Sequence, residues 1–286
     1  LPDRAITTEE DLYAALSLDF IPPPLRENTG EIEAAEKGEL PKLVSLEELQ
    51  GTFHNHTTAS DGKSSLQEMA AAAMDMGLKY LGISDHSQSS FQANGLDAER
   101  LLAQGGEIRK LNEKFAGKFR LFAGVECDIL KDGSLDYPDD ILSQLDYVVA
   151  SVHNAFTLPE DEMTARIIRA VENPHVTMIG HLTGRLLLTR KPYAVDVARI
   201  IDACAGNHTA IEINANPKRL DMDWRWWKHA RDKGVKCSIN PDAHHTSQLH
   251  HLNFGVNVAR KGWLRTTDII NCLPLEEVTK FLNVKS

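Results

Sequence analysis

Short apolar runs alternate with longer amphipathic stretches along most of the chain after residue 50. The apolar runs are rich in Val, Ile and Tyr, a composition that predicts β-strands. They span seven stretches, residues 51–56, 80–86, 119–126, 147–153, 176–181, 209–216 and 235–244. Because helical patterns lie between them, we expect repeated βα units around a parallel sheet. Seven consecutive units favour an α/β fold that closes into a TIM-like barrel over an open sheet.

The helical patterns carry apolar residues at three- and four-residue spacing. They cover residues 65–77, 98–115, 160–173, 193–206 and 222–234. Gly77, Gly206 and Gly234 stand at three of the expected helix ends, where a C-cap glycine is common. Trp224 and Trp227 would share one helix face, which favours packing over stacking on nucleic-acid bases.

Composition places the chain among soluble globular proteins, with 42% hydrophobic and 25% charged residues over 286 positions. It contains no uninterrupted apolar run of about 18 residues, and its start lacks the basic and apolar regions of a signal peptide. We therefore expect a cytoplasmic protein without a membrane span. The formal charge of −10 argues against broad electrostatic binding of nucleic acid, so any such contact should be local.

Metal-capable side chains stand at the carboxyl ends of the predicted strands, which meet at one face of a parallel barrel. His54 and His56 lie one residue apart in an extended segment and therefore point the same way. The pooled candidates are His54, His56, Asp61, His86, Glu126, His153, His181, Asp242 and His244. One ion needs three to five protein ligands, so this set predicts two or three divalent ions. Nitrogen and oxygen donors suit Zn, Mn or Fe alike, and the alternative is a buried polar network with one ion or none.

Closely spaced ions are suited to phosphoester hydrolysis, because one ion activates water at neutral pH while its neighbours hold phosphate oxygens. Arg185, just past His181, is placed to bind a phosphate oxygen, and a surface salt bridge is the alternative. Asn214 and Asn216 follow the sixth predicted strand and either position substrate or order the loop.

Basic residues in the later loops offer a second kind of contact. Arg190, Lys191, Lys218 and Arg219 form a potential basic rim for a DNA backbone, although short clusters of this kind are as often solvated loop residues. We include Arg219 among the candidate substrate contacts.

Seven motifs together resemble, in order and spacing, those of the PHP (polymerase and histidinol phosphatase) domain. They are FHNHTTASDG, ISDHS, AGVECDI, ASVHNAF, IGHLTGRLLL, IEINANPKRLD and PDAHHTSQL. IGHLTGRLLL, INANPKRLD and the late FGVNVARKGWL look like the C-terminal PHP domain of bacterial and archaeal family X DNA polymerases. The resemblance covers nearly all of residues 47–286 and implies a distorted (βα)7 barrel with a trinuclear centre. Residues 1–46 are similar to the helical stretch that joins the polymerase thumb to this domain, so we expect two regions divided there.

The resemblance also distributes the ligands among three ions. Carried over by motif, the first ion would be held by His54, His56, Glu126 and Asp242. The second would be held by Glu126, His153 and His181. The third would be held by Asp61, His86 and His244. Two positions depart from the family pattern. Thr52 stands where Asp is usual, so a carboxylate behind the ligands would be missing, and Asn240 and Pro241 replace a commoner small hydroxyl residue. The D-x-D at residues 221–223 opens a helical segment and is interpreted as helix N-terminal acids.

The activity implied by the resemblance is removal of nucleotides or phosphate from DNA 3′ ends, with Arg185, Asp242 and His153 as catalytic residues. The partners would be a DNA 3′ end or a small phosphate ester, and the polymerase core domains of a longer parent chain. Residues 1–46 are too few to form a polymerase palm, so we expect that these 286 residues alone do not polymerise DNA. Two alternatives stay open: a small-molecule phosphatase of the histidinol phosphate type, which the acidic charge favours, and a metal-binding structural or regulatory domain without turnover.

Overall fold

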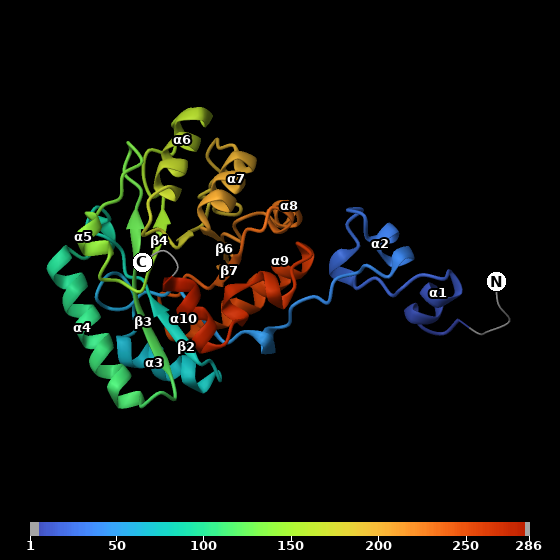
Figure 1. Ribbon diagram of the computed structural model, residues 1–286, viewed down its shortest axis with the longest axis horizontal. Helices are drawn as coiled ribbons and strands as arrows, with labels where there is room; N and C mark the ends of the chain where they lie inside the picture. The colour runs from blue at the N-terminus through green and yellow to red at the C-terminus, as the bar shows by residue number, and fades with distance from the viewer. Residues whose placement is uncertain (1–5, 284–286) are drawn as a thin grey trace.

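Seven parallel strands form a nearly closed barrel in the computed structural model, which describes residues 6–283 (Figure 1). They are β1 (Gly51–Thr52), β2 (Tyr80–Ile83), β3 (Arg120–Asp128), β4 (Tyr147–Ser151), β5 (Met178–Ile179), β6 (Ala210–Asn214) and β7 (Cys237–Asn240). They pair in chain order, and a parallel bridge between Asn55 and Ala243 joins the last strand to the first. The predicted (βα)7 barrel is therefore confirmed.

Helices surround the barrel; α3 to α8 connect successive strands, and α9 and α10 follow the last strand (Figure 1). They are α3 (Leu66–Asp75), α4 (Ala98–Phe115), α5 (Asp139–Leu142), α6 (Glu160–Val171), α7 (Val197–Asn207), α8 (Trp227–Asp232), α9 (Leu252–Lys261) and α10 (Leu275–Asn283). Within residues 6–283, no helix has both the length and the apolar character that crossing a membrane requires.

Several predicted boundaries were wrong for local reasons. β1 has only two of the six expected residues, because the backbone leaves regular pairing just before His54. α7 begins at Val197 because the side chain of Asp196 caps its first turn. Gly77 and Gly234 adopt the expected left-handed conformation, with φ of 82° and 83°, but Gly206 lies inside α7.

The aromatic face expected near α8 also differs. Trp224 lies in a short 3₁₀ turn before the helix and is half-exposed, whereas Trp227 is completely buried. The two residues therefore do not share one α-helical face. Trp227 packs in the core, as expected.

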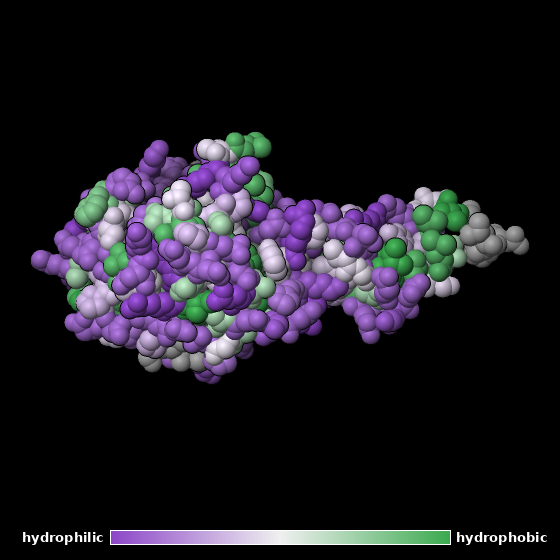
Figure 2. Space-filling model, turned by 90° about the horizontal axis from the view of Figure 1, so that it is seen from above, coloured by the Kyte–Doolittle hydropathy of each residue, from purple (hydrophilic) through white to green (hydrophobic). Residues whose placement is uncertain are grey.

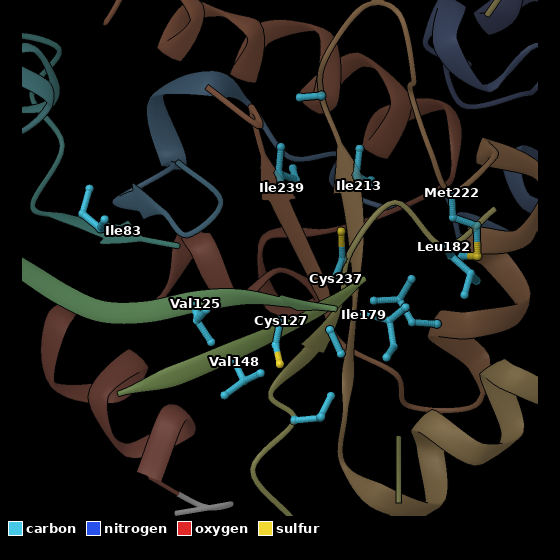
Figure 3. Close-up of a cluster of buried hydrophobic side chains, with 14 of the residues drawn as sticks. Ile83, Val125, Cys127, Val148, Ile179, Leu182, Ile213, Met222, Cys237 and Ile239 are labelled. Atoms are coloured by element: carbon cyan, nitrogen blue, oxygen red, sulfur yellow. The ribbon is translucent and has the colours of Figure 1, made fainter. Parts of the chain in front are cut away.

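Outward-facing strand residues build the larger core, between the barrel and its helices. Alternate side chains along each strand point away from the barrel interior. Figure 3 shows part of this cluster, in which Ile83, Val125, Cys127, Val148, Ile179, Leu182, Ile213, Met222, Cys237 and Ile239 lie together. All four cysteines are buried free thiols, as the absence of a paired spacing indicates.

Aromatic side chains fill the amino-terminal half of the barrel interior. Phe53 contacts Phe122 and Tyr147 there, with ring centroids 6.0 Å and 5.3 Å from its own. Glycines at positions 82 and 124 make this possible, since an added Cβ would lie 2.5 Å and 2.4 Å from atoms of Tyr147. Aromatic packing thus closes one end of the barrel, and polar side chains occupy the other.

The N-terminal segment extends from the barrel beside α9 (Figure 1). It contains α1 (Glu9–Ala15) and α2 (Glu31–Lys37) and has a small core of its own, which includes Trp263 from the barrel side. Trp263 Nε1 donates to Thr29 Oγ1 at 3.1 Å, and Lys228 Nζ donates to the Thr29 carbonyl at 2.7 Å. Hydrophobic residues gather on the outer end of this segment, whereas the barrel surface in the same view is mainly hydrophilic (Figure 2).

Candidate metal centre

The side chains of all nine predicted ligands converge at the carboxyl ends of the strands. Glu126, on β3, lies at the middle of the group and is almost completely buried. Its carboxylate oxygens are 2.8 Å from His181 Nε2, 3.0 Å from His86 Nδ1, 3.2 Å from His54 Nε2, 3.2 Å from His153 Nε2 and 3.6 Å from His56 Nε2. One carboxylate therefore faces five histidines from four different strand ends.

The remaining two carboxylates extend the cluster toward solvent. Asp242 Oδ1 lies 3.3 Å from His56 Nε2 and 3.6 Å from His244 Nδ1. Asp61 Oδ1 lies 3.3 Å from His244 Nε2 and 3.7 Å from His86 Nε2. The side chains of Asp61 and His244 are 34% and 29% exposed, so the cluster opens to solvent on their side.

The donor atoms fit divalent cations. Several buried atoms of these ligands have no hydrogen-bond partner among residues 6–283: His54 Nε2, both ring nitrogens of His56, His86 Nδ1, Glu126 Oε2 and His181 Nδ1. Leaving such groups unpaired is costly, whereas a cation would satisfy several of them at once. Three groups have donor atoms that all lie within 4.8 Å of one another: His56, Asp61, His86 and His244; His54, His56 and Glu126; and His86, Glu126 and His153.

Two further carboxylates orient the histidines from behind, and the sequence patterns did not predict them. Asp128 lies 3.0 Å from His153 Nδ1, and Glu212 lies 2.7 Å from His54 Nδ1. A carboxylate can only accept, so each Nδ1 carries the proton and each Nε2 is directed to the cluster. A signal was available, because Asp128 lies two residues after Glu126 on the same face of β3.

Thr52 and Asn240, which both depart from the family pattern, are hydrogen-bonded to each other next to Glu212. Thr52 Oγ1 donates to the side-chain oxygen of Asn240 at 3.2 Å, and Asn240 Nδ2 donates to Glu212 at 3.0 Å. Glu212 in turn holds His54, so no carboxylate is missing behind that ligand. The expectation of a missing carboxylate was wrong, because β6 supplies one through Glu212.

Opposite charges keep the buried acids of the cluster ionised. Burial by itself would raise the pKa of Glu126, but the charges of His54, His153 and His86 hold it well below its ordinary value. Burial likewise lowers the pKa of His153, yet Glu126 and Asp128 outweigh it and raise that pKa to about 10. Cation binding at these nitrogens must therefore displace protons.

Arg185 does not face the cluster. Its Nε donates to the Arg219 carbonyl at 2.9 Å, one terminal nitrogen donates to Asp223 at 2.8 Å, and the other donates to the Leu220 carbonyl. The predicted phosphate contact of Arg185 is therefore replaced by a structural role, in which it fixes the loop that carries Arg219. Arg219 is the arginine that reaches the site, with Nε 3.3 Å from Asp242 and a buried terminal nitrogen without a hydrogen-bond partner.

The two asparagines after β6 order the site. Asn214 is fully buried, and its Nδ2 donates to Glu212 and to Asp242 at 3.1 Å each. Asn216 Oδ1 accepts from the Lys218 backbone N–H at 3.0 Å. Of the two interpretations left open for Asn214, the structure favours the ordering of the loop and its carboxylates over direct contact with substrate.

The D-x-D segment divides into two different acids. Asp223 accepts from the Arg225 backbone N–H and caps the 3₁₀ turn, as expected. Asp221 is completely buried and accepts from the backbone N–H and hydroxyl of Thr183, both at 2.9 Å. Its burial raises its pKa to about 6. Interpreting Asp221 as a helix N-terminal acid was therefore wrong.

A parallel barrel that gathers buried histidines and carboxylates at its carboxyl face is suited to metal-dependent hydrolysis. The chain belongs to the PHP domain family, whose model matches residues 52–216. The resemblance in its motifs is thereby confirmed.

Similar proteins extend this assignment. The chain is 42% identical over 279 residues to the DNA polymerase/3′-5′ exonuclease PolX of Bacillus subtilis, a match that covers 98% of this chain and 48% of that protein. It thus spans about half the length of this relative. A probable phosphatase of Thermoanaerobacter sp. is 28% identical, with 81% of this chain and 94% of that protein covered.

Solved structures agree on the fold. The histidinol phosphate phosphatase of Lactococcus lactis, crystallised with zinc, L-histidinol and phosphate, superposes with a TM-score of 0.54 at 19% identity, covering 73% of this chain and 93% of that one. A putative histidinol phosphatase of Listeria monocytogenes gives 0.56 at 14% identity, covering 70% of this chain and 97% of that one. The predicted barrel is the fold of both.

Proposed function

We propose that this chain hydrolyses phosphoester bonds at the 3′ ends of DNA, using two or three divalent ions from among Zn, Mn and Fe. The observation that carries the proposal is the match to a polymerase/exonuclease, which extends over 98% of the chain, including residues well outside 52–216. The loops that contribute Arg219 and its neighbours add a local positive charge, which suits a polyanionic strand.

The chain's own residues would divide the work as follows. The nine converging histidines and carboxylates would hold the ions, which when bound activate water and offset charge on the phosphate. Glu212 and Asp128 keep the imidazoles of His54 and His153 turned toward the centre. Arg219, held in place by Arg185, would bind a phosphate oxygen through its free terminal nitrogen and stabilise charge that develops there.

The test is hydrolysis of a 5′-labelled single-stranded oligonucleotide by metal-stripped protein, with Mn²⁺ added back. We expect stepwise shortening from the 3′ end that requires both Mn²⁺ and His54. His54→Ala should abolish it while the circular dichroism spectrum stays native. A strand that stays intact with fully metal-loaded protein would refute DNA end hydrolysis.

Hydrolysis of a small phosphate ester is the second candidate. Its support is the similarity to probable phosphatases along 94% of their length and to histidinol phosphatase structures. Histidinol phosphate and a 3′-phosphorylated oligonucleotide, offered at equal concentrations, separate the two candidates. A higher kcat/KM for histidinol phosphate would favour the second.

A further inference from the structure

Two large hydrophobic side chains project into solvent from loops that follow barrel strands. Phe91, after β2, is 86% exposed, and Leu188, after β5, is fully exposed at 110%, whereas no other large hydrophobic residue between 6 and 283 exceeds 54%. Loops that follow parallel strands lie at the carboxyl face of the barrel, which carries the histidine cluster. β2 and β5 are three positions apart in the seven-strand order, so the two loops rise from opposite sides of that face.

The backbone holds Leu188 outward at an energetic cost. Its φ is 64°, in the left-handed region that non-glycine residues rarely adopt, and its side chain gains no burial in return. The tip is a tight turn in which Leu186 and Arg190 exchange backbone hydrogen bonds of 2.9 Å and 2.7 Å. Strain combined with exposure of an apolar group is typical of a binding element.

Each projecting residue is connected to the cluster by a short series of contacts. On one side, the Leu187 backbone N–H donates to the Lys218 carbonyl at 2.6 Å, and the next residue, Arg219, reaches Asp242 at 3.3 Å. Both Leu188 and the cluster are thus next to the loop that contains Arg219.

On the other side, Ser90 Oγ donates to Asp128 at 2.6 Å, and Asp128 holds His153 at 3.0 Å. Phe91 is the residue after Ser90. The two apolar side chains therefore flank the approach to the centre.

The surrounding charge identifies the chemistry of the ligand. The loops at residues 182–195 and 215–220, on the Leu188 side, contain Arg185, Arg190, Lys191, Lys218 and Arg219 but no Asp or Glu, and the loop at residues 87–96 contains no charged residue, in a chain whose formal charge is −10. Lys191 and Lys218 are exposed, next to the tip that carries Leu188. Cations beside Leu188, together with exposed apolar groups on both sides of the centre, suit single-stranded nucleic acid, whose phosphates bind the cations while its bases contact apolar side chains.

We propose that Phe91 and Leu188 contact the unpaired bases of a DNA strand whose 3′ end enters the histidine cluster. This inference rests on the proposed function and narrows its substrate to strands with unpaired ends. A small phosphate monoester has no run of bases for these side chains to contact. Base contact would add affinity for the strand without changing the chemistry at phosphorus.

The experiment measures binding and hydrolysis separately. Binding of a 5′-fluorescein single-stranded oligonucleotide is followed by anisotropy in EDTA for wild type, Phe91→Ala, Leu188→Ala and the conservative Phe91→Trp. Leu12→Ala, at a 45% exposed position on the distant α1, is the matched control. The same oligonucleotide with abasic residues at its 3′ end removes the bases but keeps the phosphates.

We expect Phe91→Ala and Leu188→Ala each to raise Kd about fivefold or more for the intact strand. Neither should change Kd for the abasic strand, and Phe91→Trp and Leu12→Ala should bind like wild type. With Mn²⁺ added back, kcat for p-nitrophenyl phosphate should be unchanged in all of them. Equal binding of intact and abasic strands by wild type, or unweakened binding by both alanine variants, would overturn the inference. If base-dependent binding holds but the strand is never shortened with Mn²⁺, the proposed function fails and the binding inference stands.

Discussion

Replacement of Glu212 by Gln is the most direct test of how the barrel positions its metal-binding histidines. Glu212 is completely buried and accepts four hydrogen bonds, two on each carboxylate oxygen. One oxygen receives His54 Nδ1 and Asn240 Nδ2, at 2.7 Å and 3.0 Å. The other receives the His181 backbone N–H and Asn214 Nδ2, at 2.7 Å and 3.1 Å.

A glutamine amide has the same shape but only one acceptor atom. Whichever way the amide turns, two donors then face an NH₂ group and lose their acceptor. Each buried donor left unpaired costs about 1–3 kcal/mol, so Glu212→Gln should destabilise the fold by about 2–6 kcal/mol. If the amide nitrogen faces His54, the imidazole would have to change tautomer, which places its proton on Nε2 and removes it as a ligand.

The assay combines metal content with thermal unfolding. We expect about 10- to 100-fold weaker binding of Mn²⁺ or Zn²⁺, measured by elemental analysis after equilibrium dialysis, and a lowered Tm of the metal-free protein. Glu277→Gln, at an exposed position on α10, is the control and should change neither quantity. Unchanged metal affinity together with an unchanged Tm in Glu212→Gln would refute the positioning role, because both effects derive from the same hydrogen bonds.

Three more changes test separate parts of the structure. Gly124→Ala places a Cβ 2.4 Å from the Tyr147 ring and should destabilise the fold by at least about 1–3 kcal/mol. Gly206→Ala, whose Cβ would have no atom within 4 Å, should stabilise the fold slightly. Urea unfolding of both variants measures these free energies. Asp221→Asn removes a carboxyl group whose pKa is raised by burial to about 6, from an ordinary value of 3.8. Between these two pH values the folded wild type keeps a proton on Asp221 that the unfolded chain has lost. Wild type should therefore lose up to about 3 kcal/mol relative to the variant as pH rises from 4 to 8, and a pH-independent difference in unfolding free energy would contradict this. Arg219→Gln should lower kcat/KM for an oligonucleotide about 100-fold in initial-rate assays at unchanged metal content, and an unchanged rate would rule out phosphate binding by that side chain.

The barrel and the positions of the converging side chains followed from local pattern. Short Val- and Ile-rich runs and their spacing depend only on which residues can line a buried parallel strand, so they predicted all seven strands. Histidines at strand ends predicted one cluster because parallel strands place those ends together. Even the early loss of regular structure in β1 left His54 and His56 directed at Glu126.

The supporting carboxylates could not be found in the same way. Glu212 lies within an apolar run that reads as an ordinary buried strand, and its role depends on His54, 158 positions away in the chain. Choosing between Arg185 and Arg219 required knowledge of which loop carbonyls the first arginine would meet. Such contacts between distant loops leave no periodic trace in the sequence.

The amino-terminal half of the barrel interior is apolar and stabilises the fold, whereas the carboxyl-terminal half holds the candidate metal ligands. This division explains how the fold tolerates so many ionisable groups in its interior. Toward the amino end, Phe53, Phe122 and Tyr147 supply apolar burial without any charge. Toward the carboxyl end, burial deprives Glu126 and its neighbouring histidines of hydration, and the attraction between their opposite charges offsets that loss. Removal of bound cations would leave the second half with unpaired donors but the first half intact. The metal-free protein should therefore keep its barrel and its loops, with the loss of order confined to the ligand side chains themselves.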